Sequence, residues 1–126
     1  MNGNLMIQGG VVVKGIKSII YEMDGHAFVI NINEKSEVIY RDVLGVVGKE
    51  CILEYLRNFF GIIDSWDNEY INMQEIDGSK WILSIIYSNG NVKEYSGRAS
   101  YPNNFEAFER LNLNLIKEVQ YGKFEY

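Results

Sequence analysis

Six short segments of the chain are rich in β-branched and aromatic residues and are separated by turn-forming residues. They are 16–23, 27–33, 37–43, 69–75, 80–88 and 91–97. Asp-Gly pairs and an Asn-Gly pair lie between several of them, and such pairs favour tight hairpin turns. In segment 80–88 both alternating sets of side chains are largely apolar, which predicts a central strand covered at least partly on both sides.

Two further segments have apolar residues at the three- and four-residue spacing of an α-helix. Between 48 and 60 these residues are Ile52, Leu53, Leu56, Phe59 and Phe60. Between about 103 and 119 they are Phe105, Phe108, Leu111, Leu115 and Val119. Pro102 precedes this second segment, and we expect Asn103 or Asn104 to cap its first backbone amides. Both helices should pack on the predicted sheet.

The stretch YEMDGHAFVI (21–30) is similar to QEIDGSKWIL (74–83), and the similarity continues into both helices. We therefore predict two similar βββα units, at about 16–63 and 69–119, within a single domain of residues 1–126. The fold class would be α+β, with two layers: one antiparallel sheet of about six strands, covered by two helices. Two smaller sheets are an alternative, and Asp-Gly could also recur only because it is a favoured turn.

Composition limits the partners that this chain could bind. Its length of 126 residues and its hydrophobic content of 47% suit one domain with a real core. The 17 acidic and 12 basic residues give a net charge of −5, which opposes general attraction to nucleic acid or an anionic membrane and favours a basic protein partner or a small molecule. The chain has no apolar run of about 18 residues and no evident signal peptide, so we expect a cytoplasmic protein.

Residues that usually carry chemistry are scarce. One histidine and one cysteine cannot form the usual zinc sites, no calcium-loop spacing is present, and the glycines near the start of the chain do not match a phosphate-binding motif. We expect His26 to be an exposed turn residue and Cys51 a partly buried residue of the first helix. The sequence therefore predicts no catalytic residues, no metal and no cofactor, and the protein is not expected to be an enzyme.

From residue 58 to 79 the chain contains no Lys, Arg or His, but it contains five carboxylates together with Trp66 and Tyr70. Aromatic rings and carboxylates together suit a surface that binds a basic protein. The predicted partner-binding residues are Asp64, Trp66, Asp67, Glu69 and Tyr70. In the alternative interpretation, Trp66 folds inward over the sheet edge and the acids simply face water.

A second candidate site is the loop SGRASYPNNF, in which Arg98 and Tyr101 precede the start of a helix. Free amides at a helix start favour anions, so these two residues could bind a phosphate or a carboxylate. The alternative is a structural connection, fixed by Gly97 and Pro102, with Tyr101 packed against the helix.

The part of the chain from 64 to 108 resembles a pattern found in small uncharacterised bacterial α+β proteins. The shared features are Trp66-Asp67, the Asp-Gly turn, the Asn-Gly hairpin, Ser96-Gly97 and Tyr-Pro-x-Asn-Phe at 101–105. The resemblance implies a fold and carries over no catalytic residues.

Small size, acidity and the lack of chemistry favour a non-catalytic protein-binding domain, such as an immunity or inhibitor protein that occupies a basic macromolecular partner. The alternative function is binding or sequestering a small anionic molecule. The domain could also form a homodimer through an exposed strand edge.

Overall fold

The computed structural model describes residues 7–8, 11–12, 15–32, 36–72, 74 and 78–121. Two helices lie in this part of the chain, α1 (Lys49–Ile63) and α2 (Phe105–Glu118). The strands are β1 (Ile7–Gln8), β2 (Val11–Val12), β3 (Ile16–Met23), β4 (His26–Asn31), β5 (Glu37–Tyr40), β6 (Val43–Val46), β7 (Glu69–Ile71), β8 (Lys80–Tyr87), β9 (Val92–Arg98) and β10 (Gln120–Tyr121). Neither described helix is long and apolar enough to cross a membrane.

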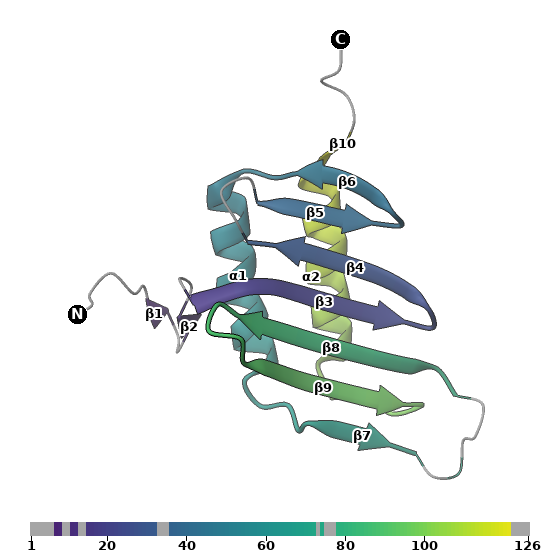
Figure 1. The fold of residues 1–126 in the computed structure, drawn as a ribbon. Helices are drawn as coiled ribbons and strands as arrows, with labels where there is room; N and C mark the ends of the chain where they lie inside the picture. Colours follow the sequence, from purple (N-terminus) through teal and green to yellow (C-terminus); the bar gives the residue numbers. More distant parts are fainter. Residues whose placement is uncertain are drawn as a thin grey trace.

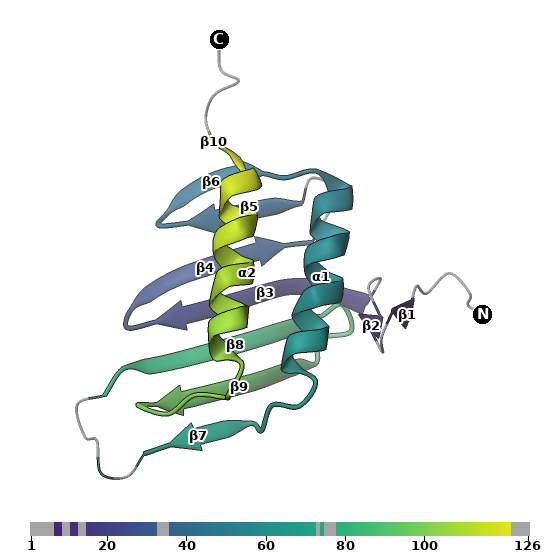
Figure 2. The same ribbon diagram turned by 180° about the vertical axis from the view of Figure 1, so that it is seen from behind.

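Strands β3 to β10 form one sheet in the order β10-β6-β5-β4-β3-β8-β9-β7, and β1 pairs separately with β2. Both helices lie across the same face of the large sheet, while the opposite face carries no described helix (Figures 1 and 2). The α+β class and the two-layer arrangement predicted from the sequence are confirmed. The predicted strand number is wrong, because the described residues place eight strands in this sheet instead of about six.

The predicted pair of equivalent βββα units is not found. The first half forms the meander β3-β4-β5-β6 before α1, so it contributes four consecutive strands. In the second half, β7 does not form a hairpin with β8; it pairs in parallel with β9 at the edge of the sheet. Asp77, the first residue of the second Asp-Gly pair, lies outside the described residues. The similar local sequences therefore belong to different strand pairings.

The hairpin turns explain part of the error in strand number. Asp24 and Gly25 both have positive φ angles, 51° and 88°, and close a two-residue turn between β3 and β4 as predicted. Arg41 and Asp42 also have positive φ angles, 54° and 66°, and form a second two-residue turn between β5 and β6. Because this turn contains neither Gly nor Asn, the segment 37–43 looks like one continuous strand in the sequence.

Strand β8 lies in the middle of the sheet, between β3 and β9, as its apolar sequence predicts. Trp81, Leu83 and Ile85 point toward the helices and are fully buried. The alternate residues Ile82 and Ile86 lie on the helix-free face and are only partly buried. The second apolar face of β8 is thus not covered by a described helix, which differs from the predicted cover on both sides (Figure 1).

Candidate functional site

The connection after α1 contains the predicted partner-binding aromatic residue, Trp66. The structure buries it, with only 8% of its surface exposed. Its ring stacks on Phe105 with a centroid distance of 5.8 Å and meets the edges or faces of Trp81 and Phe108 at 5.7 Å and 5.4 Å. Trp66 therefore belongs to the core, as the alternative interpretation held, and it offers no exposed ring to a partner.

Asn104 holds Trp66 in this position. The indole Nε1 of Trp66 donates a hydrogen bond of 2.6 Å to Oδ1 of Asn104, and Nδ2 of Asn104 donates one of 2.8 Å to the backbone oxygen of Ile62. Asn104 does precede α2, but its side chain makes no capping hydrogen bond. It instead ties the end of α1 to the start of α2. The capping prediction is wrong because distant partners compete for the same amide, and the sequence contains no signal for them.

The other residues of the predicted patch remain at the surface. Asp64, Asp67 and Glu69 are exposed. Tyr70 is half-buried, its hydroxyl oxygen accepts a hydrogen bond of 2.8 Å from the backbone N–H of Asp67, and its ring lies 6.2 Å from that of Trp81. The patch therefore consists mainly of carboxylates without the aromatic contact area that was expected. Glu75 and Asp77 lie outside the described residues.

Arg98 and Tyr101, the predicted anion-binding pair, are not brought together. Strand register places Arg98 opposite Lys80 and beside Ile71, on the helix-free face of the sheet. Tyr101 contacts the ring of Phe105 at 4.9 Å and stacks on that of Trp81 at 6.4 Å, so it belongs to the helix side. The two side chains line different clefts: Arg98 lines one of about 250 Å³, and Tyr101 lines one of about 370 Å³ together with Trp66.

The helix-free face of the sheet carries a continuous apolar row, which sequence reasoning did not identify. Ile20, Val29, Ile39 and Leu44 are successive register partners across β3, β4, β5 and β6. Leu44 at the end of the row is 53% exposed, and the other three are partly exposed. Strand alternation shows that these side chains share a face, but it does not show which face the helices cover.

More apolar residues lie on the same face of the other half of the sheet, on either side of the polar pair Ser84 and Glu94 that follows Ile20 across the strands. Ile86 is the register partner of Val92, which is 58% exposed, and Ile71 on β7 is 50% exposed. We call the apolar residues of this face the open-face patch: Ile20, Val29, Ile39, Leu44, Ile71, Ile82, Ile86 and Val92. Contiguous apolar surface of this kind marks interaction sites in soluble proteins, whereas single exposed apolar residues do not.

Charged residues lie on the same face as the open-face patch, some of them between its apolar residues. The strand register places Glu22, Glu69 and Glu94 on the same face, all of them exposed. Lys80 and Arg98 add two positive charges near β7, at one end of the sheet. This face therefore carries three carboxylates on β3, β9 and β7 and two cations close to the β7 edge.

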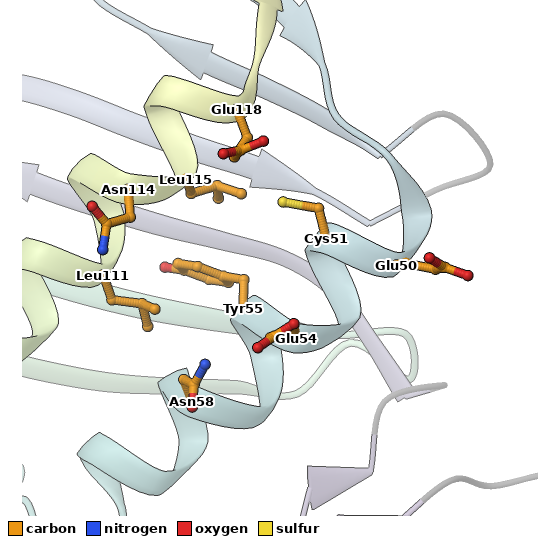
Figure 3. Close-up of a pocket in the computed structure, with 9 residues that line it drawn as sticks. All are labelled: Glu50, Cys51, Glu54, Tyr55, Asn58, Leu111, Asn114, Leu115 and Glu118. Atoms are coloured by element: carbon orange, nitrogen blue, oxygen red, sulfur yellow. The ribbon is translucent and has the colours of Figure 1, made fainter.

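A groove of about 530 Å³ runs between the outer surfaces of α1 and α2 (Figure 3). Glu54, Glu118 and Cys51 project into it, and the hydroxyl of Tyr55 points toward α2. Burial raises the pKa of the Cys51 thiol, and the nearby carboxylates of Glu118 and Glu54 raise it further. These effects oppose formation of a thiolate, so the groove does not activate Cys51 as a nucleophile.

Other candidates for chemistry also lack a suitable setting. His26 is exposed at the start of β4, as predicted for a turn residue. Within the described ranges, no group of three or more His, Cys, Asp or Glu side chains is arranged to hold a metal ion.

Comparison of the chain with models of known protein families, with curated proteins and with solved structures finds no match. The resemblance of residues 64–108 to small bacterial proteins therefore stays a prediction.

Proposed function

We propose that this protein is a non-catalytic binding domain that occupies a partner protein through the helix-free face of its sheet. An immunity or inhibitor protein would act in this way, by covering a surface of its target. The observation that carries the proposal is the row Leu44, Ile39, Val29 and Ile20, which crosses four adjacent strands on the helix-free face.

Association is favoured because it removes apolar surface of this face from water. Each Å² of apolar surface removed from water contributes about 25 cal/mol, so a row of aliphatic side chains on a rigid sheet favours association. Leu44 and Val92 lie toward opposite edges of the sheet, with more than half of each side chain exposed. The patch is therefore wide enough for a partner to contact several strands at once, as a packed helix or second sheet would.

Charge indicates the kind of partner. Glu22, Glu69 and Glu94 share the face with the patch, and the whole chain has a net charge of −5. A partner that presents apolar and basic residues would match this face and would meet it faster than a neutral protein. The three carboxylates outnumber the two cations, Lys80 and Arg98, so a basic protein complements the net charge of this face better than a second copy of the chain.

The alternative function is binding of a small anionic molecule. Arg98 and Tyr101 were the residues expected to bind it, and they line separate clefts. Within this alternative, only Arg98 retains support, because it lies in a cleft beside a second cation, Lys80. The protein-binding proposal explains the whole open-face patch, whereas the small-molecule alternative explains only the cleft at Arg98 and Lys80.

The test compares matched substitutions on the two layers of the molecule. Leu44→Glu and Val92→Glu each place a charge on the open-face patch. Leu113→Glu is the control, because Leu113 is 54% exposed but lies on α2, in the helix layer. Tagged wild-type protein and variants are purified from host lysate under gentle conditions, and retained components are weighed by native mass spectrometry.

We expect the wild type and Leu113→Glu to retain the same protein, and the two open-face variants to bind it at least about tenfold more weakly. Thermal unfolding measured by circular dichroism confirms that all variants remain folded. Equal retention by all variants would overturn the proposal. A mass of two chains and no other protein would assign the patch to self-association, and a retained mass of a few hundred daltons would support the small-molecule alternative.

A further inference from the structure

Two cations share a cleft on the helix-free face. Lys80 and Arg98 are directly opposite each other on β8 and β9, so their side chains leave the sheet side by side. Both line the cleft of about 250 Å³, whose wall also includes Ile71 and Ile82. Ser96, the register partner of Ile82, adds a hydroxyl group to the same wall. The cleft therefore combines two positive charges, a hydrogen-bonding group and apolar surface.

The two cations are not engaged in ion pairs with the part of the chain that the structure describes. Within the described ranges, no ion pair involves Lys80 or Arg98; the pair found there joins Glu106 to Arg110 on α2. The carboxylate of Asp24 is close to Lys80 but accepts its backbone N–H, at 3.1 Å. Like charges directly opposite each other on neighbouring strands repel each other and are destabilising. An anion bound between them would remove this repulsion.

We propose that the cleft receives a carboxylate side chain of the partner protein, as the anchor that sets the partner's orientation on the open-face patch. The assignment of this carboxylate to a partner protein rests on the proposed function. The planar guanidinium of Arg98 can donate two parallel hydrogen bonds to a carboxylate, while Lys80 adds a point charge. Ile71 and Ile82 contact the methylene groups that lead to the carboxylate. The partner thus presents an acidic residue here and basic residues toward the surrounding glutamates.

Glu69 also lines the cleft, and its carboxylate opposes the binding of an anion. It makes no ion pair with Arg98 or Lys80 in the described part of the chain. The cleft is therefore expected to bind free anions weakly and to favour a carboxylate that a docked protein holds in place. Replacing Glu69 by Gln should strengthen anion binding.

The first experiment measures the cleft without the partner. Sodium acetate is titrated into ¹⁵N-labelled protein at constant ionic strength, and amide chemical shifts are recorded by NMR. We expect saturable shifts at Ile82, Ser96 and Gly97, lost in Arg98→Gln, reduced in Lys80→Gln and enhanced in Glu69→Gln. Arg110→Gln on α2 is the matched control and should leave them unchanged. Shifts that are unsaturable, or equal in Arg98→Gln and wild type, would overturn the inference.

Inorganic phosphate is titrated in the same way, as a probe for a free ligand. Saturation by phosphate at much lower concentration than by acetate would assign the cleft to a phosphate-type small molecule and would overturn the carboxylate anchor. Similar weak binding of both anions, dependent on Arg98, supports the anchor.

The second experiment uses the captured partner. Arg98→Glu should weaken the complex by at least about tenfold, and reversing the charge of one acidic partner residue should restore part of the affinity. If Leu44→Glu abolishes the complex while Arg98→Glu has no effect, the anchor is wrong and the proposed function stands. If acetate binds the cleft but neither Leu44→Glu nor Val92→Glu affects the complex, the proposed function is wrong.

Discussion

A buried hydrogen bond between the two helices gives the sharpest test of how the fold is held together. The hydroxyl of Tyr55 on α1 donates a hydrogen bond of 2.6 Å to Oδ1 of Asn112 on α2. Only 3% of Tyr55 and 5% of Asn112 are exposed. Nδ2 of Asn112 is buried and has no hydrogen-bond partner among the described residues. The pair therefore gains one hydrogen bond but also leaves a donor unsatisfied.

The expected losses of unfolding free energy predict that the effects of substituting Tyr55 and Asn112 are not additive. Tyr55→Phe removes the hydrogen bond and leaves both polar atoms of the Asn112 side chain unsatisfied, which should cost about 1–3 kcal/mol of unfolding free energy. Asn112→Leu leaves the Tyr55 hydroxyl buried without this acceptor, at a similar cost, although it also removes the unsatisfied Nδ2. The double variant buries no polar atom of the pair, so its stability should return to within about 1 kcal/mol of the wild type or exceed it.

Urea unfolding, followed by circular dichroism at neutral pH, measures the four proteins of this double-mutant cycle. We expect a coupling energy of about 2–6 kcal/mol between the two positions, because the double variant should recover the losses of both single variants. Tyr87→Phe is a control, since Tyr87 is a half-buried tyrosine outside this pair. Additive losses, with the double variant as unstable as the sum of the single variants, would refute the argument that burying an unpaired polar group dominates here.

Two further predictions concern the turn between β5 and β6 and the buried tyrosines. Replacing Arg41-Asp42 by Asn-Gly should raise the unfolding free energy by about 1 kcal/mol, because Asn and Gly adopt positive φ angles more readily, and unchanged urea midpoints would count against this. Burial raises the pKa of Tyr55. Burial also raises the pKa of Tyr21, and the carboxylate of Glu109, which accepts a hydrogen bond from the Tyr21 hydroxyl, raises it further. Their stabilisation is complete below the unfolded pKa of about 10 and is lost as pH rises above it, so Tyr21→Phe should flatten the alkaline loss of stability measured by urea titration.

Local sequence signals account for the parts of the fold that were predicted correctly. Segments with a spacing of three and four residues form α1 and α2, because that spacing puts one apolar stripe on a helix. Asp24-Gly25 forms the expected two-residue hairpin, since Gly and Asp tolerate positive φ angles. Strand β8 is central because apolar residues on both of its sides disfavour an exposed edge. Each of these signals is local, so each is present in the sequence.

The fold predictions that were wrong share a different cause, because they depend on contacts between residues that are far apart in the chain. Arg41 and Asp42 form a turn that their residue types do not favour, because the flanking strands must pair to complete the sheet. Strand β7 pairs with β9 instead of β8, and a three-residue segment does not indicate its partner. Asn104 bonds to Trp66 and Ile62 instead of capping α2.

The same distinction applies to the candidate surfaces. The sequence by itself determined the acidity of the chain, the scarcity of catalytic side chains and the alternation that puts apolar residues on both faces of β8. Only the tertiary structure decided that Trp66 is buried, that Arg98 lies beside Lys80 and not Tyr101, and that the apolar row from Ile20 to Leu44 faces away from both helices. Alternation records which side chains share a face; the packing of the helices, which depends on contacts far apart in the chain, selects the face that stays open to a partner.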